Sequence, residues 1–355
     1  MYFIKEPFDL WHNLASTKKE IVIYGTGNGA IKTLNKCSEH NIKVSDIFAS
    51  DAFVRGQSFL GYKILTYNQV IEKYGKDIIV LLAFGSENID MLEHFFDLAS
   101  KHELLAPNFP LFGDTHINIS FLESNREEIM HAYSLLEDDF SRKVFSNICN
   151  YKISGKVEYL RSISTNRRED ITVLLNLSAS ERYLDLGAYN GDTVDEFLQL
   201  TNSQYESIIA VEADKKNFQK LTNRFSQQNI VNLNLIYQGI WSEKTCLTFN
   251  NAGGRASAID PNSTTSIDVN NIDNILNNQF VSFIKMDIEG AEHQALAGAV
   301  HTLTKYQPKL LIAAYHHDDD FFTLPLKLKQ INPKYKIFLR KHPYLPAWEI
   351  NMFAV

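Results

Sequence analysis

Acidic residues and glycines gather where two apolar segments of the chain end, and both residue types can hold a small ligand there. The segment Arg182–Leu186 contains Asp185 and is followed by Gly187 and Gly191. The next apolar segment ends in Glu212. Glycines let the backbone approach a ligand, and an acid that ends the second strand can accept hydrogen bonds from ribose hydroxyls. The spacing therefore predicts a site for a nucleoside-containing ligand.

The order of these groups favours S-adenosylmethionine over a dinucleotide. The acid Asp185 already stands in the first strand, and three residues separate Gly187 from Gly191. The ammonium group of S-adenosylmethionine needs such an acceptor, and this ligand lacks the pyrophosphate that a G-x-G-x-x-G turn binds. The candidate cofactor residues are Asp185, Gly187, Ala188, Tyr189, Asn190, Gly191, Asp192, Thr193, Glu212 and Ala213.

A second group of polar residues follows the later apolar segments and could carry the reaction. Asp287 ends residues 281–286, Glu289 follows it, and His316 lies just after residues 310–314. Methyl transfer from a sulfonium needs an aligned hydroxyl group that loses its proton, so a base or a metal ion is expected. We predict His316 as the base, with Asp287 as its partner and Glu289 beside them. A divalent metal with Asp287 as a ligand is the alternative, and the spacing leaves its ligand set unknown. Glu292 is expected to cap the following helix.

Three ordered motifs resemble those of one enzyme family. The run FIKMDIEGAE from Phe283 to Glu292, with the later LAGA from Leu296, resembles the signature of FkbM-type S-adenosylmethionine-dependent methyltransferases. Residues 183–193 and 211–214 match that family's cofactor motifs. The resemblance spans about residues 177–355. It implies a class I methyltransferase fold, a mostly parallel sheet closed by an antiparallel C-terminal hairpin, and O-methylation of a sugar, nucleotide-sugar or glycan.

A separate glycine turn lies near the N-terminus. An apolar segment at residues 21–24 precedes Gly25-Thr-Gly27-Asn-Gly-Ala, and a second one at residues 44–49 leads to Asp51. This pattern predicts a nucleotide or nucleotide-sugar site at Gly25, Gly27 and Asp51, and it is similar, less specifically, to Rossmann-like domains that precede some sugar-modifying enzymes. Two alternatives stay open. The domain could serve an NAD-dependent sugar reductase or epimerase, or the chain could be a non-catalytic nucleotide-binding module.

The alternation of strands and helices predicts an α/β protein with two parallel sheets. We place an N-terminal Rossmann-like domain at residues 1–117, a helical connector at residues 118–176 and the methyltransferase domain at residues 177–355. The connector is expected to be helical because its apolar residues recur at the helical period and strand patterns are lacking.

Composition limits the partners. The 355 residues carry a net charge of −7 without a basic run, which argues against nucleic-acid binding. Three widely spaced cysteines fit reduced thiols, and no apolar run reaches the roughly 18 residues of a membrane span. We therefore expect a cytoplasmic enzyme with a small-molecule or glycan acceptor, and whether it forms a homo-oligomer is left open.

Overall fold

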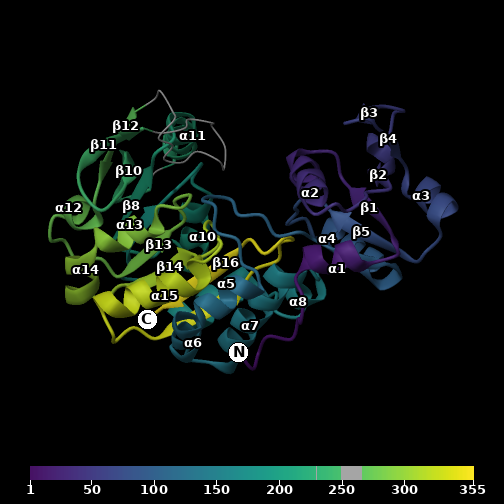
Figure 1. Cartoon of the computed structure of the whole chain (residues 1–355). Helices are drawn as coiled ribbons and strands as arrows, with labels where there is room; N and C mark the ends of the chain where they lie inside the picture. Colours follow the sequence, from purple (N-terminus) through teal and green to yellow (C-terminus); the bar gives the residue numbers. More distant parts are fainter. Residues whose placement is uncertain (229, 249–265) are drawn as a thin grey trace. The chain divides into compact units, whose positions relative to one another are not determined.

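A computed structural model describes residues 1–228, 230–248 and 266–355. The chain divides into two units, each with its own sheet. The first consists of Met1–Met130, Arg142–Ser164 and Lys341–Glu349, and the second of His131–Ser141, Thr165–Arg340 and Ile350–Val355. In Figure 1 the strands of the first sheet are purple to blue and those of the second teal to yellow.

The first unit contains a six-stranded sheet in the order β3-β4-β2-β1-β5-β6. All of its pairings are parallel except that of β3 with β4. Every residue of β5 is buried, as expected for a central strand covered on both faces. The elements are α1 (Leu10–Ser16), β1 (Glu20–Tyr24), α2 (Asn28–Glu39), β2 (Asp46–Phe48), a 3-10 turn (Asp51–Phe53), β3 (Ser58–Phe59), β4 (Tyr62–Leu65), α3 (Tyr67–Tyr74), β5 (Ile78–Leu82), α4 (Ile89–Lys101) and β6 (Glu103–Leu105).

Residues 118–176 are helical where they are regular. Arg142–Ser164 of this stretch groups with the first unit, whereas His131–Ser141 and the residues from Thr165 onward group with the second. The helices are α5 (Ile119–Ser124), α6 (Arg126–Ser134), α7 (Asp139–Ser154), α8 (Glu158–Arg161), α9 (Arg167–Asp170) and a π-helical turn (Ile171–Leu175).

The second unit contains a seven-stranded sheet in the order β15-β16-β14-β13-β7-β8-β9. The strands are β7 (Arg182–Leu186), β8 (Ser207–Glu212), β9 (Leu233–Tyr237), β13 (Phe283–Met286), β14 (Lys309–Ala313), β15 (Ile337–Lys341) and β16 (Ile350–Ala354). β16 runs antiparallel to β14, whereas β7, β8, β9, β13 and β14 pair in parallel. This arrangement confirms the predicted class I methyltransferase topology with a C-terminal antiparallel hairpin.

Helices and a small sheet complete this unit. In its core the ring of Tyr183 on β7 stacks on those of Phe197 on α10 and Phe283 on β13, with centroid distances of 4.4 Å and 4.8 Å respectively. The helices are α10 (Asp192–Leu200), α11 (Lys215–Phe225), α12 (Ile272–Leu276), α13 (Glu292–Ala297), α14 (Val300–Lys305) and α15 (Asp320–Ile331). The small sheet has the order β10-β12-β11, with β10 (Gly239–Ile240), β11 (Thr245–Thr248) and β12 (Ser266–Asn270).

The register of the parallel strands brings the predicted site residues to one edge. Asp185 on β7 lies opposite Lys285 on β13, so that Gly187 and Asp287 both follow directly at the strands' carboxyl ends. β14 pairs with the other side of β13 and leads toward His316. Ligands gather at this edge in open α/β sheets, and the candidate site is built there. Among the described residues, no helix is long and apolar enough to cross a membrane.

Candidate functional site

The turn after β7 requires glycine at two positions, because each combines a positive φ with a neighbour too close for a side chain. Gly187 has a φ of +79°, and a Cβ there would lie 1.8 Å from the carbonyl oxygen of Asp287. Gly191 has a φ of +91°, and a Cβ there would lie 2.4 Å from the ring of Phe225 on α11. A side chain at either position would therefore push the turn away from its neighbours, since real Cβ atoms do not tolerate such distances. The glycine turn is pressed directly against the strand end that carries Asp287.

Lys285 fixes this turn from inside the sheet. Its side chain is 5% exposed, and its Nζ donates a hydrogen bond of 2.8 Å to the carbonyl oxygen of Gly187. The same Nζ lies 3.2 Å from Oδ1 of Asp185, which is fully buried. Burial acts to lower the pKa of Lys285, but the carboxylates of Asp185 and Asp287 outweigh it and raise this pKa above its ordinary value. Lys285 therefore stays charged and ties the turn to the sheet.

One oxygen atom of Asp185 faces Lys285 but accepts no hydrogen bond from the part of the chain that the structure describes. Its Oδ2 accepts a hydrogen bond from the hydroxyl of Thr193 at the start of α10, whereas Oδ1 has none among the described residues. Burial raises the pKa of Asp185. A buried carboxylate oxygen with spare accepting capacity is what a cationic ligand group needs.

Glu212 ends β8 beside the same turn and is 7% exposed. Its Oε2 accepts a 2.8 Å hydrogen bond from the N–H of Tyr189, whose φ of +48° aims that N–H inward. Its Oε1 accepts a 2.7 Å hydrogen bond from the N–H of Asp214. Burial raises the pKa of Glu212 to about 7, although these two N–H groups act to lower it. The carboxylate is thus held rigidly at the edge where a ribose is expected.

The other predicted cofactor residues lie along the same segments. Ala188 is buried, and its N–H donates to the carbonyl oxygen of Val211 on β8. Asn190 accepts from the guanidinium group of Arg224 on α11, at 3.3 Å. Asp192 and Thr193 open α10, and Ala213 follows Glu212.

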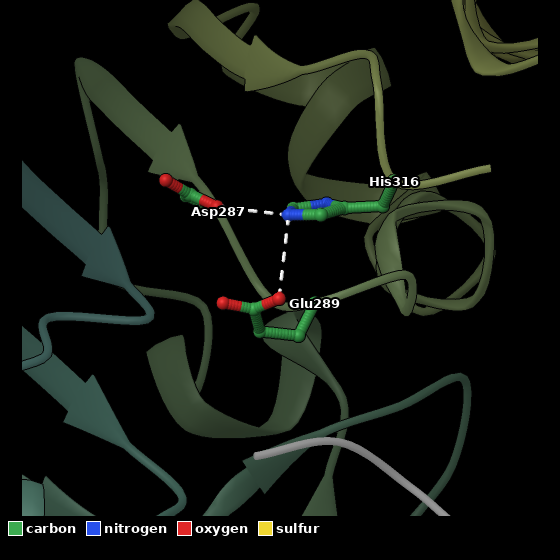
Figure 2. Close-up of side chains that lie close together, drawn as sticks. All are labelled: Asp287, Glu289 and His316. Carbon is green, nitrogen blue, oxygen red and sulfur yellow. Dashed lines mark ion pairs between the residues drawn. The ribbon is translucent and has the colours of Figure 1, made fainter. Parts of the chain in front are cut away.

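The three predicted catalytic side chains converge at the ends of β13 and β14 (Figure 2). The imidazole of His316 points its Nε2 toward both carboxylates, at 3.3 Å from Oδ1 of Asp287 and 3.6 Å from Oε2 of Glu289. One ligating atom from each residue lies within 4.8 Å of the other two. His316 is 1% exposed, while the side chains of Asp287 and Glu289 are 37% and 24% exposed. The solvent-exposed side of the cluster is therefore formed by the two carboxylates.

Glu292 lies behind His316. Its Oε1 accepts a 2.9 Å hydrogen bond from the N–H of Ile288 and lies 2.9 Å from Nδ1 of His316. α13 has no side-chain cap at its N-cap residue Ala291, so Glu292 does not cap this helix as expected; its Oε1 instead holds the loop before the helix and contacts His316. Glu292 is 1% exposed, so this contact fixes the imidazole ring in a dry environment.

The cluster contains several carboxyl groups, and their proximity shifts the pKa values of its members. Burial raises the pKa of Glu289 to about 8, assisted by the charges of Asp287 and Glu292. Burial acts to raise the pKa of Asp287 as well, but the hydrogen bond from His316 and the charge of Lys285 hold it well below its usual range. Burial acts to lower the pKa of His316, but Glu292 and Asp287 outweigh it and raise this pKa well above its ordinary value.

The first glycine turn, in the first unit, has a different character. A Cβ at Gly29 would lie 2.1 Å from the carbonyl oxygen of Ala83, so this glycine lets α2 pack closely against the end of β5. Gly25 has a φ of +120°, and a Cβ there would lie 2.8 Å from the ring of Phe84. Gly27 caps α2 and faces open space, and Asp51 is exposed in the turn that follows β2.

Two residues that build the site were missed at the sequence level as functional residues. Lys285 stands inside a strand whose other residues are apolar, and a lysine in a doubly covered parallel strand was a usable signal. Glu292 could be foreseen only as a helix cap, because its distance to His316 depends on how α13 packs beside β14.

Comparison with known proteins agrees with this architecture. Residues 185–344 match the family described as the methyltransferase FkbM domain. The structure of a methyltransferase FkbM from Methylobacillus flagellatus KT covers 98% of this chain and is itself covered to 94%, with a TM-score of 0.77 and 22% identity. Aeropyrum pernix fibrillarin matches with a TM-score of 0.34 and 13% identity, over 53% of this chain and 74% of that one. No curated protein sequence matches the chain significantly. Residues 185–344 of this chain are thus identified as a methyltransferase FkbM domain.

Proposed function

We propose that this protein is an S-adenosylmethionine-dependent O-methyltransferase whose acceptor is a hydroxyl group of a sugar, a nucleotide-sugar or a glycan. The observation that carries the proposal is the arrangement of two groups on one sheet edge. The glycine turn with Asp185 and Glu212 lies at the ends of β7 and β8, and the Asp287–Glu289–His316 cluster lies at the ends of β13 and β14. A cofactor side and a reaction side therefore adjoin each other.

The residues of the glycine turn fit S-adenosylmethionine. Oδ1 of Asp185 lies 3.2 Å from Nζ of Lys285 but accepts no hydrogen bond from the described residues, so it can accept one from an ammonium group. The buried carboxylate of Glu212 can accept from ribose hydroxyls. The tight packing at Gly187 leaves backbone rather than side chain facing the ligand. Bound S-adenosylmethionine supplies an activated methyl group, so the chain's own task is to align the acceptor oxygen and take up its proton.

Asp287, Glu289 and His316 are the side chains proposed to perform that task. The two carboxylates can accept hydrogen bonds from the hydroxyl groups of the substrate, and Glu292 orients the buried imidazole beside them. Several polar groups that converge on a partly open edge suit a polyhydroxylated acceptor, whose other hydroxyls also need partners.

The test combines binding and turnover with the full chain. Calorimetric titration with S-adenosylmethionine should show saturable binding, and trideuteromethyl-labelled cofactor incubated with cell extract and a panel of glycosides should yield labelled methyl ethers. The same titration with NADH addresses the reductase or epimerase alternative. Absence of S-adenosylmethionine binding by the folded chain would exclude the proposed function.

A second candidate function, nucleotide binding by the first unit, is favoured by the open space at Gly27. The N–H groups at the N-terminus of α2, a twelve-residue helix without a side-chain cap, can bind phosphate there. A thermal-shift screen of the full chain with UDP-sugars and dinucleotides tests this proposal. Unchanged melting with all of them, while S-adenosylmethionine still shifts it, would mean that the turn only packs α2 against β5.

A further inference from the structure

We propose that Asp287, Glu289 and His316 bind one divalent cation of the Mn²⁺ or Mg²⁺ class, which holds and activates the acceptor hydroxyl. The cation site stands on the geometry of the three side chains. Its role in activating an acceptor rests on the proposed methyltransferase function, and the experiment below separates the two.

The geometry of the cluster suits a small octahedral ion. Such ions sit about 2.1 Å from their ligands, which places neighbouring ligand atoms about 3 Å apart. Nε2 of His316 lies 3.3 Å from Oδ1 of Asp287 and 3.6 Å from Oε2 of Glu289, close to this spacing, and one ligand atom from each of the three residues lies within 4.8 Å of the other two. Figure 2 shows that the imidazole and the two carboxylates point toward a common centre.

Glu292 supplies the outer support that metal-binding histidines commonly have. A ligating imidazole usually donates its other N–H to a carboxylate, which sets the tautomer and the ring orientation. Nδ1 of His316 lies 2.9 Å from Oε1 of Glu292, and both side chains are 1% exposed. With the Nδ1 proton directed to Glu292, Nε2 can offer its lone pair to a cation beside the two carboxylate oxygens. The dication would then take the place of the proton that Nε2 shares with Asp287 when no ion is bound.

The charge count around the centre points in the same direction. Three carboxylates, those of Asp287, Glu289 and Glu292, surround one imidazole. The nearby ammonium of Lys285 is already engaged by Asp185 and the carbonyl oxygen of Gly187. Oε2 of Glu292 has no hydrogen-bond partner among the described residues, and one imidazole faces all three carboxylates. A divalent cation would balance the excess.

The exposure of the ligands leaves room for the acceptor. His316 is buried, whereas Asp287 and Glu289 are partly exposed, so the remaining coordination positions face the open edge. A hydroxyl oxygen bound there would lose its proton more easily, because the cation stabilises the alkoxide. The oxygen then forms the new O–CH₃ bond while the S–CH₃ bond breaks and its electron pair stays on sulfur. The hydroxyl proton passes to solvent at the open edge, because with the cation bound His316 is a ligand and no longer the base.

The experiment is a Mn²⁺ titration of the full chain in the absence of S-adenosylmethionine, followed by electron spin echo spectroscopy of the bound ion. We expect one Mn²⁺ per chain and a ¹⁴N modulation from one imidazole. Asp287→Asn should raise the Kd for Mn²⁺ at least tenfold, His316→Ala should abolish the modulation, and Glu292→Gln should weaken binding about 10-fold to 100-fold. Glu169→Gln, which changes an exposed carboxylate of the same unit, should leave the Kd unchanged.

Two outcomes would overturn the site. One is the absence of nitrogen modulation in the wild-type chain, which needs no variant to fold. The other is a Kd for Mn²⁺ that neither ligand substitution, Asp287→Asn or His316→Ala, changes. Separate titration with S-adenosylmethionine in chelator tests the proposed function: failure there refutes methyl transfer and leaves the cation result standing. Undiminished methylation in chelator would refute the cation's role in catalysis.

Discussion

Glu212 offers a quantitative test of the proposed cofactor site, because the affinity for S-adenosylmethionine should depend on whether this carboxyl group is ionised. Its pKa is raised to about 7, chiefly by burial. The N–H groups of Asp214 and Tyr189 and the charge of Lys285 oppose this shift, and the charge of Asp214 adds to it. Only the ionised form can accept hydrogen bonds from both ribose hydroxyls of S-adenosylmethionine. Binding should therefore favour the carboxylate and weaken as the group is protonated.

The expected change in affinity follows from the fraction of Glu212 that is ionised at each pH. A group with a pKa near 7 is about 90% ionised at pH 8 and about 10% at pH 6. The affinity for S-adenosylmethionine should therefore fall about tenfold between these pH values, which corresponds to about 1.4 kcal/mol. At pH 8, Glu212→Gln should bind at least tenfold more weakly than the wild type, since hydrogen bonds to a charged group contribute about 1.5–3 kcal/mol.

Isothermal calorimetry from pH 6 to pH 8 measures both effects. Glu212→Gln reports the pH dependence of the ligand's own groups, which is subtracted from that of the wild type. Glu206→Gln is the matched control, because Glu206 precedes the opposite end of the same strand and its side chain is 48% exposed. The reasoning is refuted if folded Glu212→Gln binds as tightly as the wild type, or if both proteins show the same pH profile.

Three further substitutions test the support of the site and of the first unit. Lys285→Met should destabilise the second unit by about 3–5 kcal/mol in urea unfolding, because Asp185 loses its buried partner, and adding Asp185→Asn should restore part of that loss. Gly187→Ala should abolish S-adenosylmethionine binding, whereas Gly75→Ala, with a similar φ of +75° but open space around it, should cost only about 1 kcal/mol of stability and leave binding intact. Burial lowers the pKa of Lys341 to about 7, so between pH 7 and 10.5 the unfolded chain binds more protons and stability rises with pH. Relative to Lys341→Met, the wild type should gain about 2 kcal/mol between pH 7 and pH 9, and equal pH profiles would contradict the shift.

The order of strands and the edge that carries the site could be predicted from the sequence. Alternating apolar segments and helices imply parallel strands, and parallel strands carry their carboxyl ends to one edge. That rule alone was sufficient to expect Asp287 and His316 on the same edge, although 29 residues separate them in the chain, and the structure places them 3.3 Å apart. Glu212 could also be predicted from the sequence, because an acid that ends a buried strand stands out against its apolar neighbours.

Interactions that depend on register or on helix packing could not be predicted in this way. Lys285 reaches Asp185 because these residues lie opposite each other on β13 and β7, and a shift of one residue would send the lysine to the other face. Glu292 reaches His316 because α13 begins beside the end of β14, which no local pattern specifies. Sequence patterns thus identified the polar residues at the ends of strands. Tertiary packing determined which other side chains, such as those of Lys285 and Glu292, hold these residues in place.

One consequence of this packing concerns how the two halves of the site communicate. The carbonyl oxygen of Asp287 lies where a Cβ of Gly187 would stand, and Lys285 joins the carbonyl oxygen of Gly187 to Asp185. The glycine turn and the Asp287 strand end are therefore one packed element, with no room for either to shift alone. A close-packed contact transmits displacement because its atoms have no void to move into. A change in the turn, such as the ordering expected when a nucleoside binds, should consequently displace Asp287. In the proposed function, the position of the bound cofactor and the position of the acceptor hydroxyl would therefore depend on each other.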